Sequence, residues 1–215
     1  MKAIVIGATG ATGKEIVENL LNNQLFSEVI ILVRKKSFKN HSRLNEIVVD
    51  FEHLEQYKNV INADIAFSCL GTTLKIAGSK ANQWKVDFDY QFQFAQLAKE
   101  NNIPTFVLLS ALGANSSSKI FYSKMKGTLE DVIKNLQFTS TYIIKPGSLI
   151  RPNTDRLGEK LGVNFIQFFN KIGLLKNYTP ITVKDLSKVM IDLGETSKKG
   201  IHVIEMNEIL NQIKN

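Results

Sequence analysis

Three glycines, Gly7, Gly10 and Gly13, follow a short apolar run over residues 2–6. A β-branched run that ends in glycines and continues as a helical pattern over residues 11–22 predicts a strand, a tight turn and a helix. Gly7 can adopt the positive φ of a sharp strand exit, and Gly13 lets the helix pack closely on the sheet. Gly10 lets a phosphate approach the backbone where the helix dipole is positive. The stretch therefore predicts a phosphate-binding turn.

The spacing of these glycines, G-x-x-G-x-x-G, differs from the G-x-G-x-x-G fingerprint of dinucleotide-binding folds. A plain structural turn is therefore the alternative interpretation. The position of the glycines, directly between a strand and a helix at the start of the chain, favours a dinucleotide site. The residues expected to contact the pyrophosphate are Gly7, Thr9, Gly10, Ala11, Thr12 and Gly13.

The remaining chain alternates between strand patterns and helix patterns. Near-continuous apolar runs such as residues 28–33 are typical of strands that are buried on both faces. This alternation predicts an α/β fold, a Rossmann-like doubly wound parallel sheet with helices on both faces. The expected strands cover residues 2–6, 28–33, 46–50, 64–71, 105–110, 142–145, 180–182 and 202–206, and the expected helices cover 11–22, 79–101, 117–136, a segment from 183 and the tail to 215.

The length and composition indicate one domain over residues 1–215, because 44% hydrophobic and 22% charged residues are typical of a soluble globular protein. The single cysteine, Cys69, allows no internal disulfide, and the three histidines are too far apart to suggest a metal site. No run approaches the ~18 apolar residues of a membrane span, and the first apolar run is too short for a cleavable signal. These features predict a cytoplasmic protein with no metal and no membrane partner.

The formal net charge is +7, from 27 lysines and arginines against 20 acidic residues. Binding to nucleic acid is one interpretation of such a charge. However, the lysines are scattered and interleaved with acidic residues. This pattern favours a solvated surface that also attracts anionic cofactors, so we expect no nucleic-acid partner.

Arg34 follows the expected strand over residues 28–33. A dinucleotide site that prefers NAD offers an acidic residue to the ribose 2′-hydroxyl at this position. A guanidinium instead pairs with a 2′-phosphate in bidentate fashion, so Arg34 favours NADP over NAD. The alternative is an ordinary basic loop on a basic protein.

Two further strand ends are expected at the cofactor, since ligands of open parallel sheets bind at the carboxyl ends of the strands. Asp50 and Phe51 end the third strand and could flank an adenine. Leu70, Gly71 and Thr72 end the fourth strand, where Gly71 would let the backbone approach the cofactor between its two riboses. Cys69 fits a small core residue better than a nucleophile.

A second constellation combines Ser110, at the end of the fifth strand, with Tyr122 and Lys126. The last two residues are four apart in a helical pattern and share one helix face. An ammonium beside a phenol favours the phenolate, which makes the pair suitable for proton transfer. Ser110 could hold a substrate oxygen within reach of the Tyr122 hydroxyl. A Tyr-x-x-x-Lys pair is common by chance in a lysine-rich chain, so the order of all the motifs carries the argument.

The glycine turn, the spacing from Ser110 to Tyr122 and the Tyr122-x-x-x-Lys126 pair resemble the short-chain dehydrogenase/reductase superfamily, in its extended or atypical branch. The segments over residues 109–114 and 121–127, together with Lys145-Pro146-Gly147, are most similar to the Tat-interacting-protein-like NAD(P)-binding oxidoreductases. The resemblance extends over nearly the whole chain.

The resemblance implies a role for each matching residue. Tyr122 would donate and accept the proton, Lys126 would bind the nicotinamide ribose, and Ser110 would orient the substrate carbonyl. Pro146 and Gly147 would border the nicotinamide. Many members of the superfamily carry an asparagine where this chain has Asp87, which leaves the proton relay of the family in question.

The sequence therefore predicts an NADP-dependent oxidoreductase that transfers a hydride between the nicotinamide and a small carbonyl or alcohol. The alternative is an NADPH-binding sensor that turns over weakly or not at all. Residues 147–178 are expected to form a small C-terminal region that covers the substrate and sets specificity. Their apolar residues at helical spacing favour a helix that caps the core, and a lid or a subunit contact is the alternative. The expected assembly is a monomer or a homodimer.

Overall fold

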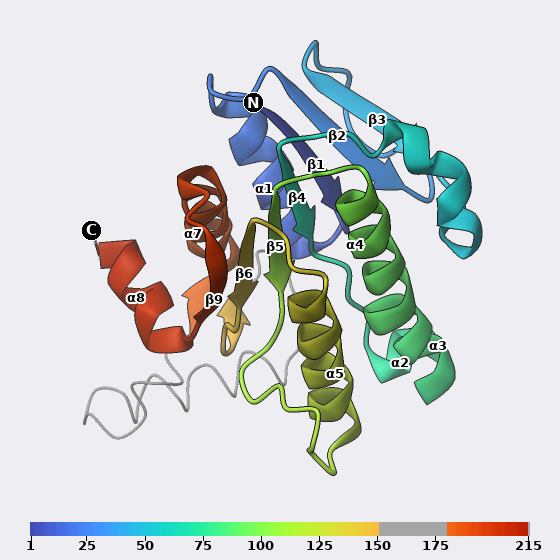
Figure 1. Cartoon of the computed structure of the whole chain (residues 1–215), viewed down its shortest axis with the longest axis vertical. Coiled ribbons are helices and arrows are strands. Elements are labelled where there is room, and N and C mark those ends of the chain that lie inside the picture. The colour runs from blue at the N-terminus through green and yellow to red at the C-terminus, as the bar shows by residue number, and fades with distance from the viewer. Residues whose placement is uncertain (151–179, 215) are drawn as a thin grey trace.

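The structure is a computed structural model that describes residues 1–150 and 180–214 of the chain (Figure 1). The described residues form a seven-stranded sheet in which all neighbouring strands are parallel. The predicted Rossmann-like α/β fold is confirmed. In their spatial order the strands are β3 (Leu44–Val48), β2 (Glu28–Val33), β1 (Lys2–Ile6), β4 (Ile65–Ser68), β5 (Thr105–Leu109), β6 (Ser140–Ile144) and β9 (Gly200–Ile204).

The strand order reverses at β1. The chain builds the sheet outward from β1 to β3, and β4 then pairs with the other side of β1. In the register, Ile4 of β1 lies between Ile30 of β2 and Ala66 of β4. Ligands of open α/β sheets bind at such a switch point, outside the carboxyl ends of the strands. The topology therefore predicts a ligand site at the loops that follow β1 and β4.

Helices cover both faces of the sheet, and each face has its own apolar core. Side chains of successive strand residues point to opposite faces. Accordingly, Ala3 and Val5 of β1 belong to one core, and Ile4 and Ile6 belong to the other. The first face carries α1 (Ala11–Asn22), α7 (Val183–Thr196) and α8 (Met206–Lys214), and the second carries η1 (Phe51–Val60), α4 (Tyr90–Glu100) and α5 (Phe121–Asn135).

The helix expected over residues 79–101 contains an irregular turn. Its first part is α3 (Lys80–Trp84), preceded by the short helix α2 (Leu74–Ala77), and its last part is α4. Between α3 and α4 lies the π-helical turn η2 (Lys85–Asp89), which contains the buried Asp87. The Gln91 side-chain amide donates to the Asp87 carbonyl oxygen at 2.7 Å, and this bond stabilises the turn. Such π turns occur frequently at functional sites.

Other boundaries differ from the prediction because side chains cap or terminate the elements. The third strand ends before Asp50, whose carboxylate accepts a hydrogen bond from the Glu52 backbone and caps η1. Helix α5 begins at Phe121 instead of residue 117, because the Asn115 side chain holds the Ser117 backbone N–H in a turn. The last strand ends at residue 204, since α8 begins two residues later.

A second, two-stranded parallel sheet pairs β7 (Leu149–Ile150) with β8 (Ile181–Thr182). The predicted substrate region over residues 147–178 lies mostly outside the described residues. In residues 1–150 and 180–214, no helix combines the length and the apolar character that crossing a membrane requires.

We predict that Gly13→Ala destabilises the protein. A Cβ atom at Gly13 would lie 2.2 Å from the Gly7 carbonyl oxygen, so the backbone of the turn would have to move. Overpacking of this kind costs about 1–3 kcal/mol in free energy of unfolding, which urea titration measures. Gly71→Ala is the matched control, because its Cβ would lie 3.6 Å from the nearest atom. Equal unfolding free energies for the two variants would contradict this account.

Candidate functional site

The glycine turn lies at the switch point of the sheet. Gly7 has a φ of 76°, and a Cβ atom there would lie 2.4 Å from the carbonyl carbon of Cys69, directly after β4. The turn is closed by a hydrogen bond from the Gly10 backbone N–H to the Gly7 carbonyl oxygen, at 2.9 Å. Only glycine allows this approach between the loops after β1 and β4.

The first turn of α1 has the features of an anion site. Its N-cap is Gly10, and no side chain of the described residues caps the helix. Thr9, Gly10 and Ala11 are exposed around this end, whereas Thr12 is buried. Backbone N–H groups at an uncapped helix N-terminus bind phosphate well, since they are unpaired and the helix dipole is positive there. The turn therefore fits the pyrophosphate of a dinucleotide.

The ends of β2 and β3 form a neighbouring part of the site. Arg34 and Asp50 are exposed, whereas Phe51 is buried with its ring centroid 5.5 Å from that of Tyr90. The Tyr90 hydroxyl donates to Glu52 at 2.6 Å. Burial and the Glu52 carboxylate raise the pKa of Tyr90, and the nearby Arg34 charge opposes this rise. An exposed guanidinium thus lies near Tyr90 at the edge expected for the adenosine.

The loop after β4 brings Leu70, Gly71 and Thr72 to the same end of the sheet. The Thr72 backbone N–H donates to the Asp87 carboxylate at 2.8 Å, which fixes this loop against η2. Burial raises the pKa of the Cys69 thiol to about 12. The thiol is therefore protonated at neutral pH, and Cys69 packs in the core as expected.

Helix α5 carries the predicted tyrosine and lysine in different environments. Tyr122 is 42% exposed, whereas Lys126, one turn further along, is buried. The Lys126 ammonium nitrogen lies 3.4 Å from Oδ1 of Asp87, and its positive charge also acts on Cys69. These contacts bring α5 to the end of β4, beside the glycine turn.

Asp87 and Lys126 form a buried ion pair. Burial raises the pKa of Asp87, while the Lys126 charge and the Thr72 N–H lower it. Among the described residues, Oδ1 of Asp87 makes no hydrogen bond of good geometry, so the ammonium is its main partner. A buried carboxylate without its counter-ion would be strongly destabilising. Asp87, which stands where many members of the superfamily carry an asparagine, is thus the partner of Lys126.

Ser110 lies directly after β5 and is buried. Its hydroxyl donates a hydrogen bond to Oε1 of Glu130 on α5. The ammonium of Lys145, which follows β6, lies 3.8 Å from the other oxygen of Glu130. The predicted substrate-orienting serine therefore has a carboxylate partner that the sequence reasoning missed.

Pro146 and Gly147 continue from Lys145 at the carboxyl end of β6. The Pro146 carbonyl oxygen accepts a hydrogen bond from the Leu112 backbone N–H at 2.9 Å, which ties the loop after β5 to the loop after β6. The Gly147 N–H points at the sulfur of Met206, at 3.4 Å. Both residues thus lie at the edge of the sheet where the nicotinamide was expected.

The sequence contains a helical pattern from which Glu130 could have been identified. Lys126 and Glu130 are four apart and fall on the face of α5 that also buries Leu129 and Ile133. Charged residues are rarely buried on an apolar helix face unless they are paired. This placement marks both as members of the site or of an internal ion pair. It does not reveal Ser110 as the partner of Glu130.

The arrangement combines two capacities at one edge of the sheet. The turn after β1 can hold a pyrophosphate, and the ends of β5, β6 and α5 bring together hydroxyl, ammonium and carboxylate groups that can hold or move a proton. Sequence-distant residues meet here because the carboxyl ends of parallel strands share one edge.

Curated relatives agree with the resemblance that the sequence predicted. The chain is 37% identical to protein HTATIP2 of Rattus norvegicus over 166 residues, which are 75% of this chain and 68% of that protein. It is 32% identical to the mitochondrial protein FMP52 of Candida albicans over 209 residues, or 94% of this chain and 90% of that one. The predicted family resemblance is confirmed.

The names of the fungal relatives contradict the predicted cytoplasmic location. The FMP52 proteins of Candida albicans, Eremothecium gossypii and Debaryomyces hansenii, and FMP52-1 of Scheffersomyces stipitis, are 30–32% identical to this chain and are named mitochondrial. The prediction was wrong because it rested on a composition and a single thiol that are typical of proteins that fold in water. Proteins of several compartments fold in water, so these features do not distinguish the cytoplasm from the mitochondrion.

The solved structures agree with the fold. The Bordetella bronchiseptica enzyme WbmH in complex with NAD⁺ superposes with a TM-score of 0.70 at 16% identity, covering 95% of this chain and 75% of that one. A family model described as NAD(P)H-binding matches residues 7–193. This range begins at the first glycine of the turn and includes Asp87, Lys126 and Glu130. The chain belongs to the NAD(P)H-binding family.

Proposed function

We propose that the protein is an NADP-dependent oxidoreductase that transfers a hydride between the nicotinamide and a small carbonyl or alcohol substrate, with Tyr122 as general acid and base. One observation carries the proposal. Helix α5 brings the Lys126 ammonium to 3.4 Å from the Asp87 carboxylate, where its charge also acts on Cys69 after β4, and leaves Tyr122 exposed one turn earlier. The hydroxyl that would transfer the proton and the turn that would hold the pyrophosphate thus lie at one edge of the sheet, which supports the proposal.

The binding roles follow from the chemistry of the exposed groups. The backbone N–H groups at the start of α1 would hold the pyrophosphate, and Gly10 leaves room for it. Arg34 would pair with the 2′-phosphate, because a guanidinium matches a phosphate in bidentate fashion. Asp50 and Phe51 would border the adenine, and Leu70, Gly71 and Thr72 the riboses. Pro146 and Gly147 would border the nicotinamide.

NADPH, when bound, supplies the hydride. The Tyr122 hydroxyl would give its proton to the substrate oxygen in reduction and take it back in oxidation. Lys126 would hold the nicotinamide ribose and stabilise the phenolate, and Ser110 would fix the substrate oxygen within reach of Tyr122. Residues 147–178 would set substrate specificity; most of this range lies outside the described residues.

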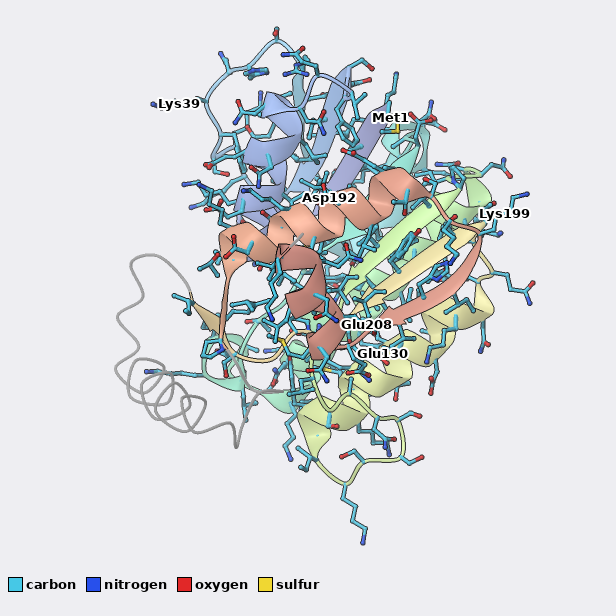
Figure 2. The ribbon with its side chains drawn as sticks, turned by 90° about the vertical axis from the view of Figure 1, so that its left-hand side faces the viewer. Met1, Lys39, Glu130, Asp192, Lys199 and Glu208 are labelled. Carbon is cyan, nitrogen blue, oxygen red and sulfur yellow. The ribbon has the colours of Figure 1, made fainter. Side chains whose placement is uncertain are left out.

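We predict that Arg34→Ala removes a preference for NADPH. A hydrogen-bonded charge is worth about 1.5–3 kcal/mol, so NADPH should bind about 10–100-fold more weakly while NADH binding stays constant. Calorimetric titration of both cofactors measures this difference. Lys39→Ala is the matched control, since Lys39 is an exposed cation in the same loop (Figure 2). Equal affinity of the unsubstituted protein for both cofactors would contradict the NADP assignment.

We predict that Tyr122→Phe lowers kcat for carbonyl reduction by about 100-fold or more, because a positioned general acid contributes 10²–10⁴-fold. The affinity for NADPH should stay within about threefold, since the exposed hydroxyl makes no hydrogen bond with the described residues. Steady-state kinetics and calorimetry give the two quantities. Tyr57→Phe, which removes a hydroxyl from η1, should leave both unchanged. Undiminished kcat in Tyr122→Phe would refute the role of Tyr122.

A second candidate function is an NADPH-binding sensor that does not turn over. The buried pair of Lys126 with Asp87 favours it, because a neutralised ammonium stabilises a nearby phenolate less. This candidate requires tight NADPH binding without NADPH oxidation across a broad panel of aldehydes and ketones. Any carbonyl that is reduced in a Tyr122-dependent way would exclude it.

A further inference from the structure

Four polar residues form a path from the interior of the sheet to its surface. They come from four different elements: Ser110 follows β5, Glu130 lies in α5, Lys145 follows β6 and Glu205 follows β9. In Figure 2 the label of Glu130 lies close to that of Glu208 on α8. The proposed function gives a task to Ser110 and none to the other three residues.

The inner part of the path is a hydroxyl bonded to a buried carboxyl. The Ser110 hydroxyl donates to Oε1 of Glu130, and both residues are almost fully buried. Burial raises the pKa of Glu130, whereas the Ser110 hydrogen bond and the Lys145 charge lower it. A carboxyl with a raised pKa is closer to the pH at which proton transfer works best than an ordinary glutamate is.

The outer part of the path connects this carboxyl with solvent. The Lys145 ammonium lies 3.8 Å from Oε2 of Glu130 and 3.1 Å from Oε1 of Glu205. The Glu205 side chain is 50% exposed, whereas that of Lys145 is 12% exposed. The groups that act on Glu130 from neighbouring segments are the Ser110 hydroxyl, the Lys145 ammonium and the Glu205 carboxylate. The Lys134 ammonium acts on it from the same helix.

We propose that Glu130 is a positioning and proton-relay residue of the active site, which exchanges a proton with the substrate oxygen through the Ser110 hydroxyl. This inference rests on the proposed function. The geometry that carries it is the direct bond between the predicted substrate-orienting serine and a buried carboxyl, whose second oxygen faces a cation on the way to the surface.

The proton balance of the step is complete. In reduction, the carbonyl carbon accepts the hydride that NADPH supplies, and the carbonyl oxygen takes the proton of the Tyr122 hydroxyl. The product hydroxyl then returns this proton to the Tyr122 phenolate and takes the proton of the Ser110 hydroxyl, while the Ser110 oxygen takes the proton of the neutral Glu130 carboxyl. The resulting carboxylate regains a proton from solvent, beside the Lys145 charge. Oxidation runs the same transfers in reverse, because a hydroxyl both donates and accepts.

The direction of the pH dependence follows from this balance. Reduction needs protonated Glu130, so its kcat/KM should fall as the pH rises through the pKa of Glu130. Oxidation needs the carboxylate, so its kcat/KM should fall as the pH drops through the same value. Burial raises this pKa, so kcat/KM for both reactions should change at a pH above the ordinary pKa range of a glutamate.

Glu130→Gln tests the relay, because the amide oxygen still accepts the Ser110 hydrogen bond but exchanges no proton. We expect kcat to fall about 100-fold and the pH dependence of kcat/KM that Glu130 causes to disappear. NADPH affinity, measured by calorimetry, should stay within about threefold, which also shows that the variant is folded. Glu130→Asp should restore part of kcat together with this pH dependence. Asp131→Asn, an exposed charge change on the same helix, is the matched control.

The outcomes separate this inference from the proposed function. Turnover in Glu130→Gln with an unaltered pH profile would overturn the relay and leave the oxidoreductase intact. No turnover of any carbonyl by the unsubstituted protein would overturn the proposed function and the relay with it. A carbon-13 NMR titration of the glutamate carboxyls adds a readout that needs no substrate. The pKa of Glu130 should rise further in Ser110→Ala, and an unchanged value would overturn the coupling.

Discussion

The close approach of the turn after β1 to the loop after β4 is the constraint on which the site depends. Gly7 contacts the backbone of Cys69 and Gly13 contacts Gly7, both at distances that exclude a Cβ atom. This packing brings the uncapped start of α1 to the point where the strand order reverses. This arrangement suits an anion such as a pyrophosphate, because backbone N–H groups and the positive end of the helix dipole meet there.

Pairing of buried charges determines what surrounds this turn. Removing an isolated charge from water is costly, so buried acids and bases in a stable fold are paired. Two such pairs lie side by side on α5, with Lys126 against Asp87 and Glu130 against Lys145. One helix thereby organises the polar groups at the ends of β4, β5 and β6. Tyr122, at the start of the same helix, is exposed to solvent.

The sequence predicted the elements well where the signal was local. Apolar runs located the strands, and the glycines located the turn, because both patterns are set by neighbouring residues. Boundaries failed where a side chain capped the next element, as Asp50 does at the start of η1. The π turn around Asp87 was not predicted, since nothing in the spacing of residues 79–101 marks one extra residue per turn. Composition could not separate compartments, and the predicted location was wrong.

The sequence by itself determined the α/β alternation, the glycine turn after the first strand and the shared helix face of Tyr122 and Lys126. These features depend on residues that are close in the chain. Only the tertiary structure decided that Asp87 is the counter-ion of Lys126 and that Glu130 holds Ser110. The physical reason is that parallel strands bring their carboxyl ends to one edge, so residues far apart in sequence become neighbours there, and buried charges then select their partners by distance.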